Sequence, residues 1–457
     1  ILRKHSFNVR LHPDERKFTK FLWLTDVNNI DSPLKVYQFK SVLFQVGAVC
    51  SPFILNAVIK THLDNNCDIN TANQMKDNIY VDNVIDGVYS EADAVKCYSE
   101  STSLMNSCGF NLRAWSSNSP DLCELATRDN KYEPADEVSV LGMRWKITPD
   151  VLTHSRVNSQ PQVASFITKR DIVSFTASVY DPLGLISPVL VRAKLFIQLL
   201  WKLKLEWDEP LSPELYEQWI LIAEDLTAAR DNQINRKYFD KTSPGDTYQM
   251  HTFADASTSA YGAVVFLRRQ HETALVMSKT RVAPKSELSL PKLELMAALI
   301  ATRLGKLVLN ALSDKFNITE HFLWSDSQAT LHWINSSKKL PVFVQNRVQE
   351  IRDFTQEYKY CPTVDNPADL LTRGISANDL RSNPKWNYGP SWLPDQQMWS
   401  TWDVNNATQL HVNIMKEDDD LVNPDTTSPV INAQTAREAT DESDNSGVQR
   451  IIDIIQR

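Results

Sequence analysis

The chain contains 457 residues, of which 42% are hydrophobic and 23% are charged. This length allows roughly two to four domains, and the hydrophobic content excludes a protein that is disordered throughout. No stretch of about 18 uncharged apolar residues predicts a membrane span, and no charged region followed by a long apolar run indicates a secretion signal. We therefore expect an intracellular protein of the cytoplasm or nucleus, and the first residue, Ile1, leads us to expect that the chain begins inside a longer one.

The net charge of −8 is concentrated at the C-terminal end. Residues 416–457 contain ten acidic and four basic side chains, so the rest of the chain is nearly neutral. A nearly neutral remainder of the chain is compatible with a local basic groove that binds nucleic acid. The six cysteines form no Cys-x-x-Cys pair and lie near no histidine at zinc spacing, which predicts reduced thiols in a protein core.

Residues 1–115 predict a mixture of strands and helices. Residues 36–44 alternate like a strand, and residues 51–63 are typical of a helix that has Pro52 in its first turn. Residues 78–87 predict a hairpin with Asp-Asn at its centre.

The next part, residues 116–247, is expected to be a mainly helical region. Residues 116–135 are polar and predict a loop, whereas residues 189–201 and 213–230 form long amphipathic stretches. The sequence Ser-Pro-Gly-Asp at residues 243–246 indicates a boundary after these helices.

Residues 248–375 predict three strands, a long helix, a fourth strand and two further helices. Three strands before the first long helix favour a mixed sheet with helices packed on it. The fold class is therefore α/β, in a multidomain α+β arrangement. The predicted elements are residues 251–255, 260–268, 273–278, 287–309, 321–326, 328–335 and 342–355.

The C-terminal part divides into two segments. Residues 376–412 contain Trp386, Trp392, Trp399 and Trp402, and we interpret them as an extension that packs on the preceding domain. Residues 413–457 are interpreted as an acidic linker, in which residues 416–446 are expected to be disordered because they lack aromatic side chains and carry clustered like charges.

Four acidic residues occupy positions that are unusual for solvated side chains. Each lies at the end of a predicted strand, inside an apolar helical run or at the start of a helical turn: Asp255, Glu294, Asp326 and Asp369. A charge in apolar surroundings is costly unless it is paired or binds metal. Four converging carboxylates would repel one another, and Mg²⁺ or Mn²⁺ would relieve that repulsion because hard cations prefer oxygen ligands.

Two such ions about 3.5–4 Å apart can activate water and stabilise the leaving oxygen of a phosphodiester. The alternative is that each acid is a helix cap or part of a solvated face. Asp369, two residues after Pro367, is also what an ordinary first helical turn would contain. Spacing alone does not establish that the four residues meet.

The stretches around these acids resemble the ribonuclease H domain of Bel/Pao-type LTR retrotransposon polyproteins. The matching stretches are HTFADASTSAYGAVVFLR (251–268), SELSLPKLELMAALIATRL (286–304), FLWSDSQATLHWI (322–334) and YCPTVDNPADLLTRG (360–374). The resemblance implies that Asp255, Glu294, Asp326 and Asp369 are the catalytic, metal-binding quartet for two Mg²⁺ or Mn²⁺ ions. Residues 361–368 lack the histidine that retroviral ribonucleases H often carry before the last aspartate.

The resemblance continues upstream and downstream of this domain. Residues 36–63 and 78–88 resemble the palm of the family's reverse transcriptase, and residues 140–152 and 175–201 resemble the segment between polymerase and nuclease. WNYGPSWL (386–393) resembles the extension after the nuclease, and RIIDI (450–454) resembles the sequence that leads into integrase. The implied architecture is a truncated palm in residues 1–115, a thumb- or connection-like helical region in residues 116–247 and a ribonuclease H-like domain in residues 248–375.

The palm departs from its family in two places. The usual Tyr-Val-Asp-Asp turn is Tyr80-Val81-Asp82-Asn83 in this chain, and Asn83 lacks the second negative charge. The other metal-binding aspartate is expected just before residues 8–16, where Ile1-Leu2-Arg3-Lys4 offers none. We therefore expect no reverse transcriptase activity from this chain alone.

Segments like residues 140–300 have also been described as an aspartic peptidase associated with Pao elements. Such peptidases need Asp-Thr/Ser-Gly, and the sequence contains no such triplet. Asp181-Pro182-Leu183-Gly184 is no substitute because proline lacks the hydroxyl and the backbone N–H. The peptidase remains the weaker alternative.

Contacts with a substrate are predicted for basic residues around the loop that enters the Glu294 helix. The candidates are Arg268, Arg269, Lys279, Arg281 and Lys285, with a solvated basic loop as the alternative. Trp333 is expected to pack in the core rather than beside a duplex.

The sequence thus favours a metal-dependent nuclease that cuts the RNA strand of RNA–DNA hybrids. Its expected partners are the hybrid and other segments of the polyprotein, namely integrase and the upstream fingers. The alternative is a nucleic-acid-binding remnant of a decayed element that retains the fold without turnover.

Overall fold

The computed structural model describes residues 11–41, 51–66, 70–80, 83–88, 90–155, 166–240, 243, 245–284, 288–355 and 357–400. The chain divides into two compact units, formed mainly by residues 1–138 and by residues 150–456. The linker predicted for residues 413–457, including the disorder expected for residues 416–446, lies outside the described residues, as does Trp402.

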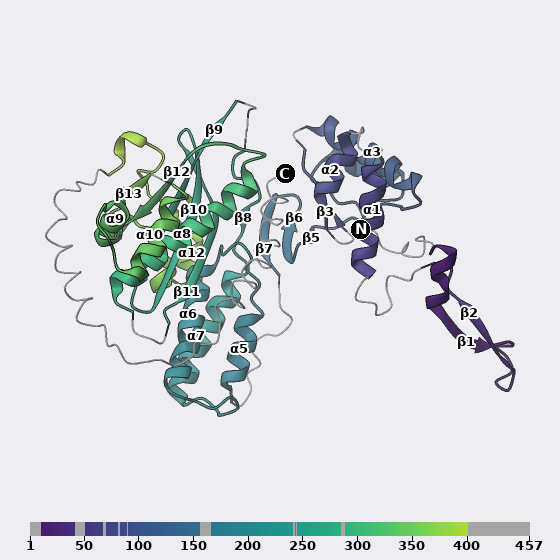
Figure 1. The fold of residues 1–457 in the computed structure, drawn as a ribbon, viewed down its shortest axis with the longest axis horizontal. Coiled ribbons are helices and arrows are strands. Elements are labelled where there is room, and N and C mark those ends of the chain that lie inside the picture. The colour runs from purple at the N-terminus through teal and green to yellow at the C-terminus, as the bar shows by residue number, and fades with distance from the viewer. Residues whose placement is uncertain are drawn as a thin grey trace. The chain divides into compact units, whose positions relative to one another are not determined.

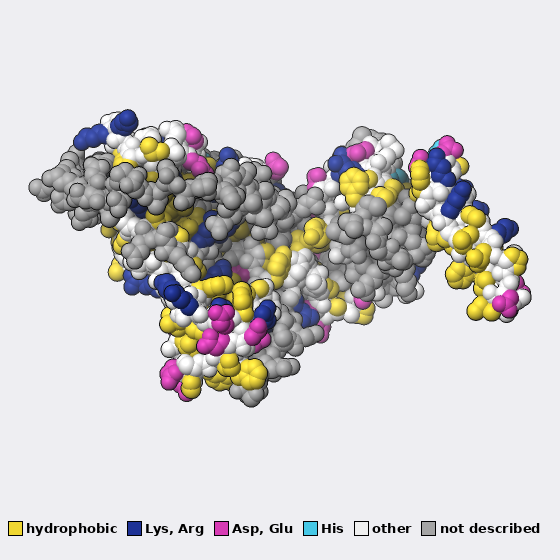
Figure 2. Space-filling model, turned by 60° about the horizontal axis from the view of Figure 1, so that its bottom comes forward, with side chains coloured by type: hydrophobic (Ala, Val, Ile, Leu, Met, Phe, Trp, Pro, Cys, Tyr) yellow, Lys and Arg dark blue, Asp and Glu magenta, His cyan; other side chains and the backbone are white. Residues whose placement is uncertain are grey.

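The first unit begins with a 3-10 helix, η1 (Pro13–Thr19), and an antiparallel hairpin of β1 (Lys20–Leu24) and β2 (Leu34–Gln38). Hydrophobic side chains lie on the surface of this hairpin, as Figure 2 shows. The strand predicted for residues 36–44 ends earlier, at Gln38.

Further along the described part of this unit come four helices and a short hairpin: α1 (Ser51–Asp64), α2 (Asn70–Asn78), β3 (Ile79–Tyr80), β4 (Asn83–Val84), α3 (Glu91–Ser107) and α4 (Pro120–Arg128). Ile59, Leu63, Met75 and Met105 are buried in its core. The predicted helix at residues 51–63 and the predicted hairpin are both present. The loop predicted for residues 116–135 is partly wrong, because Ser119 caps α4 and Pro120 fits the first turn.

A four-stranded sheet is built from β5 (Glu137–Val140), β6 (Met143–Lys146), β7 (Val151–His154) and β8 (Ile234–Asn235), in that order. Its second strand contributes Met143 and its third strand contributes Leu152 to the larger core of the second unit.

The second unit is centred on a five-stranded mixed sheet in the order β11-β10-β9-β12-β13. Its strands are β9 (Thr247–Ala256), β10 (Ala260–Arg269), β11 (Glu272–Val282), β12 (Asn317–Ser325) and β13 (Tyr358–Tyr360). Strand β10 is antiparallel to β9 and β11, whereas β12 runs parallel to β9 and β13. The mixed sheet predicted from the sequence is confirmed, and β13 is an addition to it.

The two faces of this sheet are covered by different helices (Figure 1). Ala263, Val265 and Leu267 belong to a core that includes α8 (Leu290–Leu312), α9 (Gln328–Asn335) and α10 (Val342–Arg352). Val264 and Phe266, which alternate with them along β10, belong to a second core. That core contains α5 (Lys169–Ala177), α6 (Ser187–Lys202), α7 (Pro213–Ala229), α11 (Asp369–Arg373), α12 (Ala377–Arg381) and α13 (Pro384–Tyr388).

The helices of residues 166–240 therefore share one core with the sheet. The boundaries drawn at 115/116 and 247/248 do not coincide with the division into compact units. The sequence pattern favoured a separate helical region because a helix that packs on a sheet and a helix that packs on other helices have the same apolar periodicity.

Three tryptophans of the C-terminal extension, Trp386, Trp392 and Trp399, belong to the core that contains α5–α7. Trp386 is buried and its indole N–H donates to the Leu185 carbonyl at 3.0 Å, while Trp399 makes an edge-on ring contact with Trp324. Trp333 is buried in the core of the opposite face, as predicted. Helix α8 is long and apolar enough to cross a membrane by length and composition, but 67% of its most apolar stretch is buried inside the protein, as in a core helix.

Candidate active site

Asp255 lies near the end of β9, the central strand of the mixed sheet, opposite Gly262 of β10. Its carboxylate is buried, with 7% of the residue exposed. A Cβ atom at Gly262 would lie 2.8 Å from the Lys279 carbonyl oxygen and 3.1 Å from the Leu371 Cβ. The glycine thus allows α11 to approach the sheet beside Asp255.

Asp326 follows the last residue of β12, the parallel neighbour of β9. Ser325 is in register with Ala254, so both aspartates leave the sheet at the same end of two adjacent strands. Asp326 is followed by Ser327, whose side chain caps α9 by accepting the Thr330 N–H at 3.2 Å. The cap explains why the chain turns away from the sheet directly after the carboxylate.

Glu294 comes from the first turns of α8. Leu293, Leu295 and Leu299 are buried in the core beneath this helix, and Met296 packs against the same core. The Glu294 carboxylate accepts a hydrogen bond from the Ser327 hydroxyl, which joins α8 to the end of β12.

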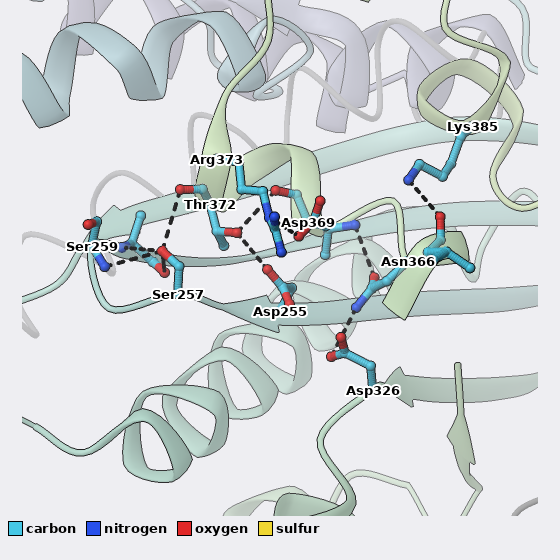
Figure 3. Close-up of polar contacts among 12 residues, drawn as sticks. Asp255, Ser257, Ser259, Asp326, Asn366, Asp369, Thr372, Arg373 and Lys385 are labelled. Carbon is cyan, nitrogen blue, oxygen red and sulfur yellow. Dashed lines mark hydrogen bonds and ion pairs between the residues drawn. The ribbon is translucent and has the colours of Figure 1, made fainter. Parts of the chain in front are cut away.

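Asp369 is the first residue of α11 and lies close to Asp255 and Asp326 (Figure 3). Its carboxylate pairs with Arg373, one helical turn later, at 2.6 Å. The Asn366 side chain donates to the Ala254 carbonyl at 2.9 Å and to the Asp326 carboxylate at 3.4 Å. The Thr372 hydroxyl lies 2.6 Å from the Asp255 carboxylate.

The four predicted acids influence one another electrostatically. Burial, together with the charges of Asp326, Asp369 and Glu294, raises the pKa of Asp255 to about 7, against the Thr372 hydrogen bond. Burial and the charge of Asp326 also raise the pKa of Glu294 to about 7. The pKa of Asp326 is raised by burial and by Asp369. Like charges and desolvation both favour the neutral acids.

The donor set suits a hard divalent cation because all four groups offer carboxylate oxygens, from a buried Asp255 and from half-buried Glu294, Asp326 and Asp369. Within the described ranges, no three acidic, histidine or cysteine side chains lie close enough together to hold an ion between them. Each carboxylate instead has a side-chain partner, and a cation would replace some of these bonds.

The partners of the four carboxylates were not predicted as site residues. Asn366 carries one detectable signal, since asparagine before proline often forms a local turn, and its side chain accepts the Ala368 N–H at 3.1 Å. Ser327 and Thr372 have no comparable signal, because their contacts depend on residues far away in the sequence.

The predicted contact with substrate is wrong for two of the basic residues. Arg268 and Arg269 lie at the opposite end of the sheet, since Arg268 pairs with Gln249 whereas Gly262 pairs with Asp255. Six residues of strand correspond to about 20 Å. Arg268 donates to the Pro394 carbonyl, and Arg269 pairs with Asp246 at 3.0 Å and with Glu272.

Lys279 and Arg281 lie on β11 toward the end of the sheet that carries the acids, with Arg281 opposite Tyr261. Lys285 lies outside the described residues. The predicted polymerase turn is a hairpin in which Tyr80 pairs with Asn83, so Asn83 lies on a strand and not at the centre of the turn. Val81 and Asp82 lie outside the described residues.

One family model matches part of this region. Residues 168–327 match the family model of the Pao retrotransposon-like RNaseH-like domain. The match confirms the predicted resemblance for this segment, which includes Asp255, Glu294 and Asp326, together with helices α5–α7. Asp369 lies beyond the matched range. No curated protein sequence matches the chain significantly.

Solved structures with a similar arrangement include the foamy viral protease-reverse transcriptase. In its complex with double-stranded DNA, the match has 13% identity and a TM-score of 0.44 and covers 78% of this chain and 65% of that one. For its complex with an RNA/DNA hybrid, the match has 12% identity and a TM-score of 0.46 and covers 79% of this chain and 43% of that one. Ribonuclease H1 from the archaeon Halobacterium salinarum matches with 14% identity and a TM-score of 0.20, over 29% of this chain and 96% of its own. The chain thus spans less than two thirds of the viral protein chains.

Proposed function

We propose that the second unit hydrolyses the RNA strand of RNA–DNA hybrids and depends on a divalent cation. The observation that carries the proposal is the gathering of four carboxylates at one end of the sheet. They come from β9, α8, the end of β12 and the start of α11, and burial together with the charges of the other three acids raises the pKa of Asp255 to about 7. Buried charges of this kind are commonly paired or coordinate a metal.

The residues suggest a division of roles. Asp255 and Asp326 would hold two Mg²⁺ or Mn²⁺ ions most directly, Glu294 would orient the second ion and its water, and Asp369 would complete the outer part of the site. Bound in this way, the ions would supply an activated water and stabilise the leaving oxygen of the phosphodiester. Ser327 and Asn366 would keep the Glu294 and Asp326 carboxylates in position.

The hybrid would be recognised by its backbone and 2′-hydroxyl groups, so we expect little preference for sequence. Of the predicted basic contacts, Lys279, Arg281 and Lys285 remain candidates. Arg268 and Arg269 are excluded because their guanidinium groups are engaged at the other end of the sheet.

We further propose that this chain is a segment of a retrotransposon polyprotein. Other polyprotein segments, namely integrase and the upstream fingers, would be its partners, and residues 1–115 would be a palm without polymerase activity because Asn83 replaces the second aspartate.

The second candidate function is a non-catalytic nucleic-acid-binding remnant, which the substitution at Asn83 favours. An aspartic peptidase is disfavoured by the contacts of Asp181. Its carboxylate accepts the N–H groups of Leu185 and Ile186 at 2.8 and 3.0 Å and lies 3.1 Å from His154. The carboxylate is thus buried in the turn before α6, where these contacts occupy it.

The test is cleavage of a labelled RNA–DNA hybrid by the parent chain and by Asp326→Asn, with double-stranded DNA as a substrate control. We expect Mg²⁺- or Mn²⁺-dependent cleavage of the RNA strand by the parent and none by the variant, whose side chain has the same shape but no charge. Equal rates for the two proteins would refute the nuclease. Hybrid binding by the parent without cleavage would favour the remnant.

A further inference from the structure

One short segment supplies the side-chain partners of three of the four carboxylates. Asn366 bonds to Asp326, Thr372 to Asp255 and Arg373 to Asp369, and all three partners lie within residues 366–373. Glu294 is the exception, with Ser327 as its partner. The same segment carries Asp369, so its placement on the sheet affects the whole site (Figure 3).

Thr372 has the most central position in this segment. Its hydroxyl lies 2.6 Å from the Asp255 carboxylate and 3.0 Å from the Asp369 carbonyl oxygen. A hydroxyl carries one hydrogen and donates to one acceptor at a time. The shorter contact is the one to the carboxylate, and hydrogen bonds to ionised groups are the stronger kind.

Because Thr372 is buried, its hydrogen bond can hold the Asp255 carboxylate in place. Thr372 is 2% exposed, so water does not compete for the hydroxyl. A threonine side chain is branched at Cβ and has few accessible rotamers, which fixes the direction of its hydroxyl. The Asp255 carboxylate is thereby held in one orientation relative to the helix that begins with Asp369.

The Thr372 hydroxyl is not needed to attach its segment to the sheet, because other hydrogen bonds do so. The Thr280 hydroxyl donates to the Leu371 carbonyl at 2.9 Å, and Asn366 donates to the Ala254 carbonyl at 2.9 Å. These two bonds attach α11 and the preceding turn to the sheet without involving a carboxylate. Removal of the Thr372 hydroxyl therefore leaves the segment attached and frees Asp255.

We propose that Thr372 is a positioning residue of this site, which orients Asp255 for a divalent cation. The proposal rests on the proposed nuclease function for its purpose, but cation binding tests it without turnover. Groups that orient metal ligands typically change affinity or activity by about 10- to 100-fold when they are removed.

The experiment measures Mn²⁺ binding by isothermal titration calorimetry for the full chain and for Thr372→Val, Thr372→Ser and Thr302→Val. Thr302 is the matched control, since it is also 2% exposed and its hydroxyl bonds only within α8, to the Ala298 carbonyl at 2.9 Å. We expect about 10-fold weaker Mn²⁺ binding for Thr372→Val, recovery to within about twofold for Thr372→Ser and no change for Thr302→Val. Thermal unfolding without metal compares the folding of all four proteins.

Hybrid cleavage is then measured over a range of Mn²⁺ concentrations. If the parent is active, the Mn²⁺ midpoint should rise for Thr372→Val while the KM for the hybrid stays within about twofold. If the parent binds Mn²⁺ without cutting the hybrid, the nuclease proposal fails, and weaker binding by Thr372→Val still supports the positioning role. Unchanged Mn²⁺ affinity in Thr372→Val, or no Mn²⁺ binding by the parent, overturns the positioning role.

Discussion

The Trp386 indole N–H donates to the backbone carbonyl of Leu185 at 3.0 Å, although 201 residues separate the two in sequence. The bond joins α13 to the turn before α6, and helices α6 and α13 cover the same face of the mixed sheet. This contact bears on how much of the chain the second unit needs in order to fold.

We predict that residues 139–400 fold when they are expressed alone and that residues 248–375 do not. The shorter fragment would expose Phe253, Phe266, Phe322 and Trp324, whose burial is worth about 1.5–3 kcal/mol for each side chain. Circular dichroism and size-exclusion chromatography of both fragments provide the measurement. A monomeric, cooperatively unfolding fragment of residues 248–375 would contradict the prediction.

Asp255→Asn should stabilise the metal-free protein at pH 8. The pKa of Asp255 is raised to about 7, so the stability contributed by its neutral form is complete below its ordinary pKa of 3.8 and is lost as the pH rises through 7. The amide is neutral at every pH, so the variant should melt at a higher temperature than the parent at pH 8. The difference should shrink at pH 5.5.

Thermal unfolding in chelator at the two pH values tests this effect, with Asp353→Asn as a control from the surface end of α10. A variant that melts below the parent at pH 8 would show that the Asp255 charge stabilises the fold. Addition of Mn²⁺ should reverse the order of the two proteins, because the cation compensates the charge in the parent alone.

His251 should make the protein sensitive to acid. Its ring is buried and its Nδ1 accepts the Trp324 indole N–H at 3.1 Å, and burial followed by the charge of Arg268 lowers its pKa to about 3. The stability of its neutral form is complete above the ordinary value of 6.5 and declines as the pH falls toward 3.

The predicted slope from this residue is about 1.4 kcal/mol per pH unit within that window. Urea unfolding of the parent and of His251→Gln between pH 7.5 and 4 measures it. The advantage of the parent over the variant should decrease as the pH falls, and a constant difference would exclude His251 as the source.

Arg269→Ala should reduce the stability of the fold without changing the affinity for nucleic acid. The guanidinium is 10% exposed and pairs with Asp246 and Glu272, so the variant leaves two carboxylates without their cation. We expect a lower midpoint in chemical denaturation. Hybrid affinity at fixed salt should be unchanged, and a selective loss of affinity would restore Arg269 as a contact.

The parent chain should not extend a DNA primer on an RNA template. Two carboxylates on neighbouring strands are needed to hold the metals of a polymerase, and Asn83 lacks the charge of the second. Primer extension with Mg²⁺ and with Mn²⁺ is the measurement. Nucleotide incorporation by the parent chain that is lost in Asp82→Ala would show that the palm is active.

Much of the nuclease fold could be predicted from the sequence because its signals are local. The strands predicted at residues 251–255, 260–268 and 273–278 before a long helix at residues 287–309 indicated a mixed sheet with a packed helix, and the motifs around Asp255, Glu294 and Asp326 indicated the acids. Helix α4 was missed because its polar composition outweighed the Ser-Pro start signal.

The partners within the site could not be predicted, since they depend on distances in space. Arg268 and Arg269 are near Asp255 in sequence, but an antiparallel turn carries them to the other end of the sheet. Thr372 and Asp255 are 117 residues apart and meet only because Gly262 admits α11. No periodic pattern encodes such a contact.

The segment 366–373 has a consequence for the order in which the chain is made. Helices α5–α7 and strands β9–β12 leave the ribosome before Asp369 and Thr372, and the tryptophans of the extension follow last. Asp255 and Asp326 are thus synthesised before the segment that supplies their side-chain partners. A nascent chain that stalls before residue 366 would expose the aromatic face of its sheet and carry an incomplete site, so the site would be assembled only after translation has passed this point.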